Sequence, residues 1–340
     1  MRIAQISPLY ESVPPSGYGG TERVVSWLTE ALVAAGHELT LFASADSRTN
    51  ARLVACAPRA LRLDPEAHDP VASHLLMLEQ VFQRAREFDV IHAHVDYLAF
   101  PFARRVPVPA LTTLHGRLDL PVLGPVFREY REQRVVSISN HQRRPLAHAR
   151  WEATIHHGLP PDLFEFHAEP DDYLAFLGRI SPEKRVDRAI EIAVRAGRRL
   201  RIAAKIDAAD QAYYEREIRG LFEHPLIEYV GEVGDCDKNE FLGQAAGVLF
   251  PIDWPEPFGL IMIEALACGT PVIAWPHGSV PEVIEHGVSG FICADVDAAV
   301  RAVGELEKLD RRRCREEFES RFSAERMARD YLAVYRRMLA

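Results

Sequence analysis

Short apolar runs alternate with amphipathic stretches along the whole chain, and each segment has the length of one strand or helix. Residues 2–7 form the first run, and a helix predicted from about Thr21 carries its apolar residues on one face and ends at Gly36. A second clear helix spans 185–196 and is closed by Gly197. Further strands are predicted at 38–44, 89–94, 109–115, 134–139, 172–179, 200–206, 227–231, 247–252 and 270–275. The alternation is typical of α/β proteins, in which helices cover a parallel sheet.

The chain is long enough for two such domains. It has 340 residues, and a domain typically takes about 150. The stretch 158–172, rich in proline and acids, is a plausible linker. We therefore expect one domain over 1–160, a second over 161–322 and a C-terminal helix over 323–340 that packs back toward the first domain. Open α/β sheets bind ligands at the carboxyl ends of their strands, so we expect a ligand cleft between the domains.

Composition excludes several classes of protein. Five cysteines form no CxxC pair, which argues against a disulfide framework or zinc ribbon and suits a reducing cytosol. We expect a cytoplasmic protein, because the first residues do not resemble a signal peptide and no apolar run reaches the length of a membrane span. The second half, 151–340, holds 23 basic and 34 acidic residues, which disfavours nucleic acid as a partner. The arginine pairs at 104–105 and 143–144 have two alternative explanations, weak peripheral contact with an anionic membrane or ordinary solvation.

Lysine is scarce in this chain, which has 36 arginines and only four lysines. Lysine is a compact point charge and arginine a planar fork, so a site that needs lysine does not freely change to arginine. The four lysines are Lys184, Lys205, Lys238 and Lys308. The position of each therefore decides its importance.

The segment PIDWPEPFGLIMIEALACGTPVIAW, residues 251–275, carries the clearest chemistry. It predicts a helix from about Pro257 to Ala267 that is apolar on every face except at Glu264, and Glu256 stands just before its start. A carboxylate in an apolar helix is costly to bury without hydrogen-bond donors, so the two acids could bracket one ligand. Gly259 lets backbone N–H groups at the helix start approach an anion. The alternative is an acid that complements the helix dipole plus one solvated glutamate.

A second candidate cluster is LGRISPEKR, residues 177–185. Arg179 and Lys184 flank a turn after a strand, so both cations can reach one point above the sheet edge. Cations fixed there would stabilise a phosphorylated ligand, most strongly where negative charge develops in a transition state. Lys205 ends another strand and is a third candidate contact to such a ligand, or a surface lysine beside Asp207.

The first half offers weaker signals. The loop PPSGYGGT, 14–21, places glycines before a helix but is not a dinucleotide fingerprint. His115 follows a strand at its carboxyl end, where a lone histidine is usually structural. The run HAHVD, 92–96, puts two histidines and an acid on one strand face, but no further ligands point to a metal.

These motifs, in this order, resemble those of the family 4 glycosyltransferases. The glycine pair 19–20, TLHG, LGRISPEK, EPFGL with its second glutamate at E-x7-E spacing, and GSVPEVIEHGVSGF cover nearly the whole chain. The resemblance implies a retaining enzyme of the GT-B fold, an α/β architecture of two Rossmann-like domains facing across a cleft. It also implies that Glu256 binds hydroxyls of the donor sugar and Glu264 the ribose hydroxyls of the nucleotide. The amides around Phe258, Gly259 and Leu260 would line the sugar and diphosphate.

The resemblance gives roles to the other candidates as well. It assigns Arg179 and Lys184 to the diphosphate, and it places Gly19 and Gly20 near the diphosphate or the acceptor. His115 would touch the donor sugar and back the developing oxocarbenium charge through its neighbouring carbonyl. The chain departs from the family at two places, since Arg185 stands where a glycine usually follows the lysine, and His156-His157-Gly158 stands where Asn-Gly is common.

We therefore expect transfer of a hexosyl group, glucose by preference, from a nucleotide diphospho-sugar, preferably UDP-linked, to a saccharide, glycolipid or small-molecule acceptor. No residue stands out as a covalent nucleophile, which favours a same-face displacement, and no metal or cofactor is expected. A GDP-mannose-dependent mannosyltransferase, a sugar-nucleotide epimerase or glycoside phosphorylase of the same fold, and a non-catalytic nucleotide-sugar sensor are the alternatives.

Overall fold

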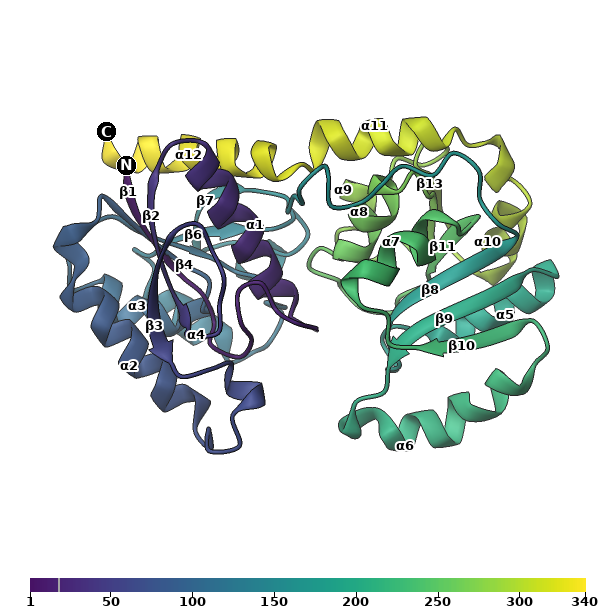
Figure 1. Ribbon diagram of the computed structural model, residues 1–340, viewed down its shortest axis with the longest axis horizontal. Helices are drawn as coiled ribbons and strands as arrows, with labels where there is room; N and C mark the ends of the chain where they lie inside the picture. The colour runs from purple at the N-terminus through teal and green to yellow at the C-terminus, as the bar shows by residue number, and fades with distance from the viewer. Residues whose placement is uncertain (18) are drawn as a thin grey trace. The chain divides into compact units, whose positions relative to one another are not determined.

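The protein folds into two compact units, each built on its own parallel sheet (Figure 1). The computed structural model describes residues 1–17 and 19–340, apart from the side chains at positions 235 and 236. The N-terminal unit comprises Met1–Pro160 and Ser323–Ala340, and the C-terminal unit comprises Pro161–Phe322. In the described part of the chain, no helix combines the length and apolar character needed to cross a lipid bilayer.

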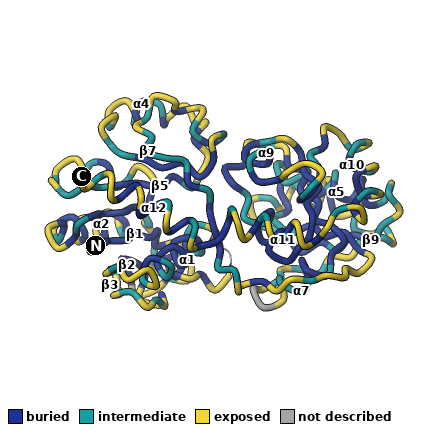
Figure 2. Tube along the Cα trace, turned by 90° about the horizontal axis from the view of Figure 1, so that it is seen from above, coloured by how far each residue is buried: buried dark blue, intermediate teal, exposed yellow. Residues whose placement is uncertain are grey.

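The N-terminal unit has a seven-stranded sheet in the order β3-β2-β1-β4-β5-β6-β7. Its strands are β1 (Arg2–Ile6), β2 (Glu38–Ser44), β3 (Arg52–Ala57), β4 (Val90–Ala93), β5 (Ala110–Thr113), β6 (Arg134–Ser137) and β7 (Arg150–Thr154). Its helices are α1 (Gly20–Ala34), α2 (Pro70–Gln83), α3 (Phe100–Ala103), α4 (Leu123–Glu129) and α12 (Ala324–Leu339). Buried residues follow the central strands, as Figure 2 shows along β1 and β5. Such near-continuous apolar strands are typical of a parallel sheet covered on both faces.

The last helix, α12, belongs to the N-terminal unit although it comes from the end of the chain. Ser323 caps the helix by accepting a hydrogen bond from the N–H of Arg326. The guanidinium of Arg326 donates to the carbonyls of His156 and His157, at 2.8 and 3.0 Å. A Cβ at Gly158 would lie 2.2 Å from the carbonyl oxygen of Ser323, so this close approach needs a glycine. The segment after β7 and the start of α12 are thus fixed to each other.

The C-terminal unit has a six-stranded sheet in the order β10-β9-β8-β11-β12-β13. Its strands are β8 (Tyr173–Arg179), β9 (Arg199–Lys205), β10 (Ile227–Gly231), β11 (Gly247–Phe250), β12 (Val272–Ala274) and β13 (Gly290–Ile292). Its helices are α5 (Val186–Ala196), α6 (Gln211–Tyr213), α7 (Asp235–Gly243), α8 (Leu260–Ala267), α9 (Val280–Val283), α10 (Val296–Val303) and α11 (Arg311–Arg321). Helices α5 and α10 pack against each other, and their buried residues share a core cluster with residues of β8 and β9.

Candidate active site

The candidate site of the C-terminal unit lies where the strand order reverses beside β8. From β8 the chain adds β9 and β10 on one side, and it later adds β11, β12 and β13 on the other. Ligands of open α/β sheets bind in the crevice outside the strand ends at such a point. Arg179 and Lys205 are the last residues of β8 and β9 and are paired in register. The loop 251–259 follows the carboxyl end of the neighbouring strand β11. The predicted residues therefore lie near one another at the carboxyl ends of the strands.

Lys184 and Glu256, which come from separate sequence motifs, meet in this site. The Nζ of Lys184 forms a close ion pair with Oε2 of Glu256. The indole Nε1 of Trp254 donates to the same oxygen at 2.9 Å. The ammonium also lies 5.1 Å from the centre of the Trp254 ring. Glu256 is buried, and an ion pair with a second donor is what a buried carboxylate requires.

Glu264 lies inside the apolar helix α8, and its partner is Lys238. The Nζ of Lys238, on α7, donates to Oε1 of Glu264 at 2.9 Å, and the two side chains are only 13% and 5% exposed. Sequence reasoning expected a donor for Glu264 but did not identify it. The scarcity of lysine was the available signal, since Lys238 is one of four in the chain. The sequence could not show that α7 lies against α8.

Arg179 and Lys205 lie among carboxylates. The guanidinium of Arg179 is 2.6 Å from Glu183, 3.5 Å from Asp207 and 3.8 Å from Asp210. The ammonium of Lys205 is 2.9 Å from Asp207, and its hydrogen bond lowers the pKa of that carboxyl group. Asp207 therefore joins the two predicted phosphate-binding cations. A diphosphate that binds at this edge must compete with these acids.

The start of α8 differs slightly from the sequence prediction. The helix begins at Leu260 instead of near Pro257, and Gly259 precedes it in a left-handed conformation with φ 78°. A Cβ at Gly259 would lie 3.0 Å from Cε of Met262 and 3.2 Å from Cζ of Phe250, so both the backbone and the packing favour glycine there. The proline-rich approach and this left-handed residue delay the helix. Helix α8 still starts directly after the loop that follows β11.

The loop after β12 supports the loop that carries Glu256. The Oγ of Ser279 donates to the carbonyl of Phe258 at 2.6 Å, and the N–H of Ser279 donates to the carbonyl of Glu256 at 3.0 Å. A Cβ at Gly278 would lie 2.1 Å from that carbonyl oxygen of Glu256. Sequence reasoning used Gly278 and Ser279 only as part of an ordered motif. Their contacts show that they hold the backbone at Glu256.

His115 lies in a buried histidine cluster of the N-terminal unit. Its Nε2 is 2.9 Å from Nδ1 of His94, whose Nε2 is 2.8 Å from Oε1 of Gln5. The ring of His157 stacks on it at 5.2 Å between centres. Burial lowers the pKa of His115 to about 3, so its imidazole is neutral near pH 7. Its Nδ1 is buried and has no hydrogen-bond partner among the described residues.

His92, from the HAHVD run, is bound on both ring nitrogens. Its Nδ1 is 2.7 Å from the hydroxyl of Tyr335 on α12, and its Nε2 is 2.8 Å from the hydroxyl of Thr113. These contacts join α12 to the sheet of the N-terminal unit. Within the described ranges, no group of three or more His, Cys, Asp or Glu side chains is arranged to hold a metal ion.

Gly19 and Gly20 stand at the start of α1. Gly19 precedes the helix with φ 156°, and a Cβ there would lie 2.9 Å from Cβ of Pro15. Glu22, in the first turn of α1, is buried, and this burial raises its pKa to about 7. The neighbouring Glu11 pairs with an arginine of the loop after β3 at 2.9 Å. The glycine pair therefore borders a buried acidic group, which the sequence did not reveal.

Comparison with known proteins identifies the family of this chain. Residues 18–179 match the family model described as Glycosyltransferase Family 4, and residues 163–321 match Glycosyl transferases group 1. The chain belongs to the family 4 glycosyltransferases. Among relatives of this family, glycogen synthase of Mycobacterium tuberculosis (strain CDC 1551 / Oshkosh) is 27% identical, over 91% of this chain and 86% of that protein. A phosphatidyl-myo-inositol mannosyltransferase of Mycobacterium leprae (strain TN) is 26% identical, over 89% and 86%.

A solved structure shows the same fold. The Anabaena protein HepE, in complex with UDP-glucose, matches with a TM-score of 0.72 at 17% identity, over 99% of this chain and all of that chain. The family 4 glycosyltransferase described here therefore has the GT-B fold predicted from its sequence. The architecture of two parallel sheets with covering helices agrees with that assignment.

Proposed function

We propose that this glycosyltransferase transfers a hexosyl group, glucose by preference, from a UDP-linked sugar to a saccharide, glycolipid or small-molecule acceptor, with retention of configuration. The C-terminal unit would bind the donor, and the N-terminal unit would bind the acceptor. No metal or cofactor takes part in the proposed reaction.

One observation carries the proposal. Glu256 precedes helix α8 and Glu264 lies within it, beside the point where the strand order reverses. Each carboxylate forms an ion pair with a lysine, Glu256 with Lys184 and Glu264 with Lys238. Burying two ion pairs at one sheet edge is costly unless they serve a ligand or a specific packing role. A sugar presents hydroxyls to Glu256, a ribose presents hydroxyls to Glu264, and a diphosphate presents negative charge to Lys184.

The proposed mechanism is a same-face displacement. As the bond between the anomeric carbon and the phosphate oxygen breaks, the diphosphate gains negative charge, which Lys184, Arg179 and the first N–H groups of α8 stabilise. The departing phosphate oxygen takes the proton of the acceptor hydroxyl, and the acceptor oxygen bonds to the anomeric carbon on the same face. Glu256 holds the sugar hydroxyls. For the neutral imidazole of His115 we propose a hydrogen bond to a donor-sugar hydroxyl.

Two comparisons support the preferred donor. UDP-glucose is the ligand of HepE, and glucose agrees with a relative named glycogen synthase. A GDP-mannose donor is the second candidate, because another relative of similar identity is named a mannosyltransferase.

A thermal-shift panel of UDP, GDP and ADP and their glucose and mannose forms tests the donor. The preferred ligand raises Tm because it binds only the folded state. Glu264→Gln should abolish most of that shift, whereas the matched control Glu305→Gln, at an exposed ion pair, should keep it. Product NMR then reports the anomeric configuration. The proposal fails if no nucleotide raises Tm, or if the product is inverted.

A further inference from the structure

The residue after Lys184 is Arg185, where the family usually has a glycine. Arg185 adopts φ 55° and ψ 51°, in the left-handed region that disfavours residues with a side chain. A strained residue persists only where surrounding contacts hold it. The contacts of Arg185 therefore show what holds it in this conformation.

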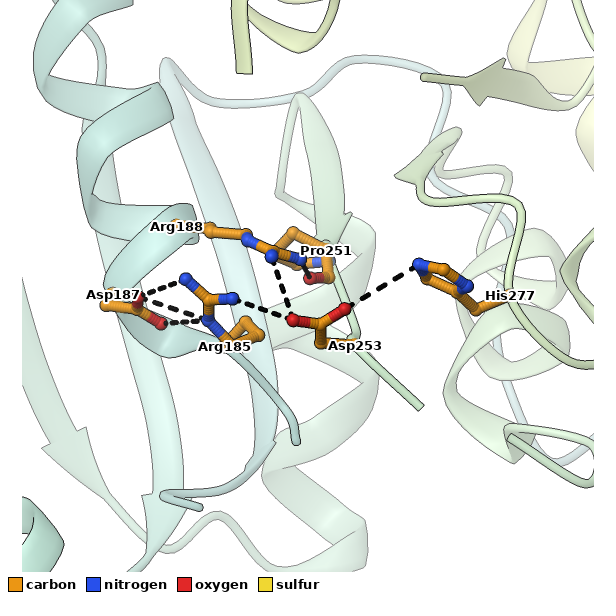
Figure 3. Close-up of polar contacts among 6 residues, drawn as sticks. All are labelled: Arg185, Asp187, Arg188, Pro251, Asp253 and His277. Atoms are coloured by element: carbon orange, nitrogen blue, oxygen red, sulfur yellow. Dashed lines mark hydrogen bonds and ion pairs between the residues drawn. The ribbon is translucent and has the colours of Figure 1, made fainter. Parts of the chain in front are cut away.

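The guanidinium of Arg185 binds two aspartates (Figure 3). Its Nη2 lies 2.7 Å from Asp187 on α5, and its Nη1 lies 2.9 Å from Oδ2 of Asp253 in the loop after β11. Arg188 reaches the same Oδ2 at 2.9 Å, and Nε2 of His277 lies 3.8 Å from the other oxygen of Asp253. Asp253 thus joins the loop after β8, helix α5 and the loop after β12.

Arg185, Arg188 and Asp253 are called the clasp below. The clasp links the same two chain segments as the Lys184–Glu256 pair. Arg185 is the next residue after Lys184, and Asp253 comes three residues before Glu256. The backbone strengthens the link, because the N–H of Asp253 donates to the carbonyl of Glu183 at 2.9 Å. The same two loops are therefore joined twice, once through candidate catalytic groups and once through the clasp.

We propose that Asp253 is a positioning residue that keeps Lys184 and Glu256 in register through Arg185 and Arg188. This inference rests on the proposed function. When a donor binds, Glu256 must turn to sugar hydroxyls and Lys184 to phosphate, so their own ion pair weakens. The clasp uses neither group and stays closed, which preserves the spacing of the two loops during the reaction.

The Arg185→Gly variant separates positioning from stability. Glycine relieves the left-handed backbone but removes the Arg185 part of the clasp, so Tm should stay the same or rise while kcat falls about tenfold. Donor KM should change less than threefold, because Lys184 and Glu256 remain available for binding. Asp253→Asn should lower kcat similarly, and Asp253→Glu should restore part of it. Turnover is expressed per nucleotide-binding site measured by calorimetry, which removes any effect of misfolded protein.

Asp297→Asn is the matched control. Asp297 pairs with Arg195 near the other end of α5, and both side chains are well exposed, so this variant should keep wild-type kcat. The inference is overturned if Arg185→Gly and Asp253→Asn keep wild-type kcat, or if their kcat falls only in step with the fraction of folded protein.

Hydrogen exchange provides a readout that needs no substrate. Asp253→Asn should raise amide exchange in 180–185 and 251–259 together, while Asp297→Asn should not. If the wild-type protein transfers no sugar from any donor tested, the proposed function fails, and exchange still decides whether Asp253 holds the two loops. Unchanged exchange in both loops overturns the inference.

Discussion

Replacing Lys238 with methionine tests how α8 tolerates its single acid. Methionine has a similar length to lysine but no charge, so the change removes the ammonium from Glu264 and keeps most of the packing. Glu264 is 5% exposed as a side chain, and the residues around it in α8 are apolar. Its carboxylate would lose the contact that now lies at 2.9 Å.

The magnitude follows from the burial of the pair. Removing one partner of a buried ion pair costs about 3–5 kcal/mol, because the other charge stays buried without compensation. Lys238 is 13% exposed, so we expect the lower end, about 3 kcal/mol, in the free energy of unfolding. Replacing both residues with methionine should recover the wild-type value to within about 1 kcal/mol, since the helix then becomes wholly apolar.

Urea unfolding at neutral pH of the wild type, Lys238→Met, Glu264→Met and the double variant completes a double-mutant cycle, which gives the coupling between the two residues. Lys308→Met is the matched control, because Lys308 is 71% exposed and its ion pair should contribute less than about 1 kcal/mol. A loss of less than about 1 kcal/mol in Lys238→Met would refute the reasoning that this pair stabilises a buried carboxylate.

Three further predictions concern single side chains. Lys184→Ala should lower kcat at least about a hundredfold in steady-state assays, because a placed cation no longer stabilises the departing phosphate; wild-type turnover would contradict this role. Asp207→Asn should tighten UDP binding several-fold by calorimetry, because the acid now contacts both Arg179 and Lys205; an unchanged Kd would place the phosphate elsewhere. Glu22 has its pKa raised by burial from 4.5 to about 7, so the native state binds more protons than the unfolded state between these values and loses stability as pH rises through them. Relative to wild type, the free energy of unfolding of Glu22→Gln should therefore rise by up to about 3 kcal/mol between about pH 5 and about pH 8. A difference between the two proteins that does not change with pH would contradict the assignment.

Apolar periodicity predicted most central strands, because these are buried on both faces and leave a continuous signal. It missed β3, β7 and β13, each at the edge of its sheet. Edge strands contact a neighbour on one side only, and β7, for example, has no fully buried residue. The fourth edge strand, β10, was predicted although it has no fully buried residue either, so an edge position weakens the pattern without always removing it.

The candidate site was likewise predicted only in part from the sequence. Sequence alone established which side chains stand at strand ends and helix starts, including Arg179, Lys184 and Glu256, because local patterns fix where elements begin and end. Only the tertiary structure showed that Lys238 meets Glu264 and that Arg185 meets Asp253. These partners lie 26 and 68 residues apart in the chain. Such pairs are set by how helices cross and which strands adjoin, and the packing of the whole unit determines both.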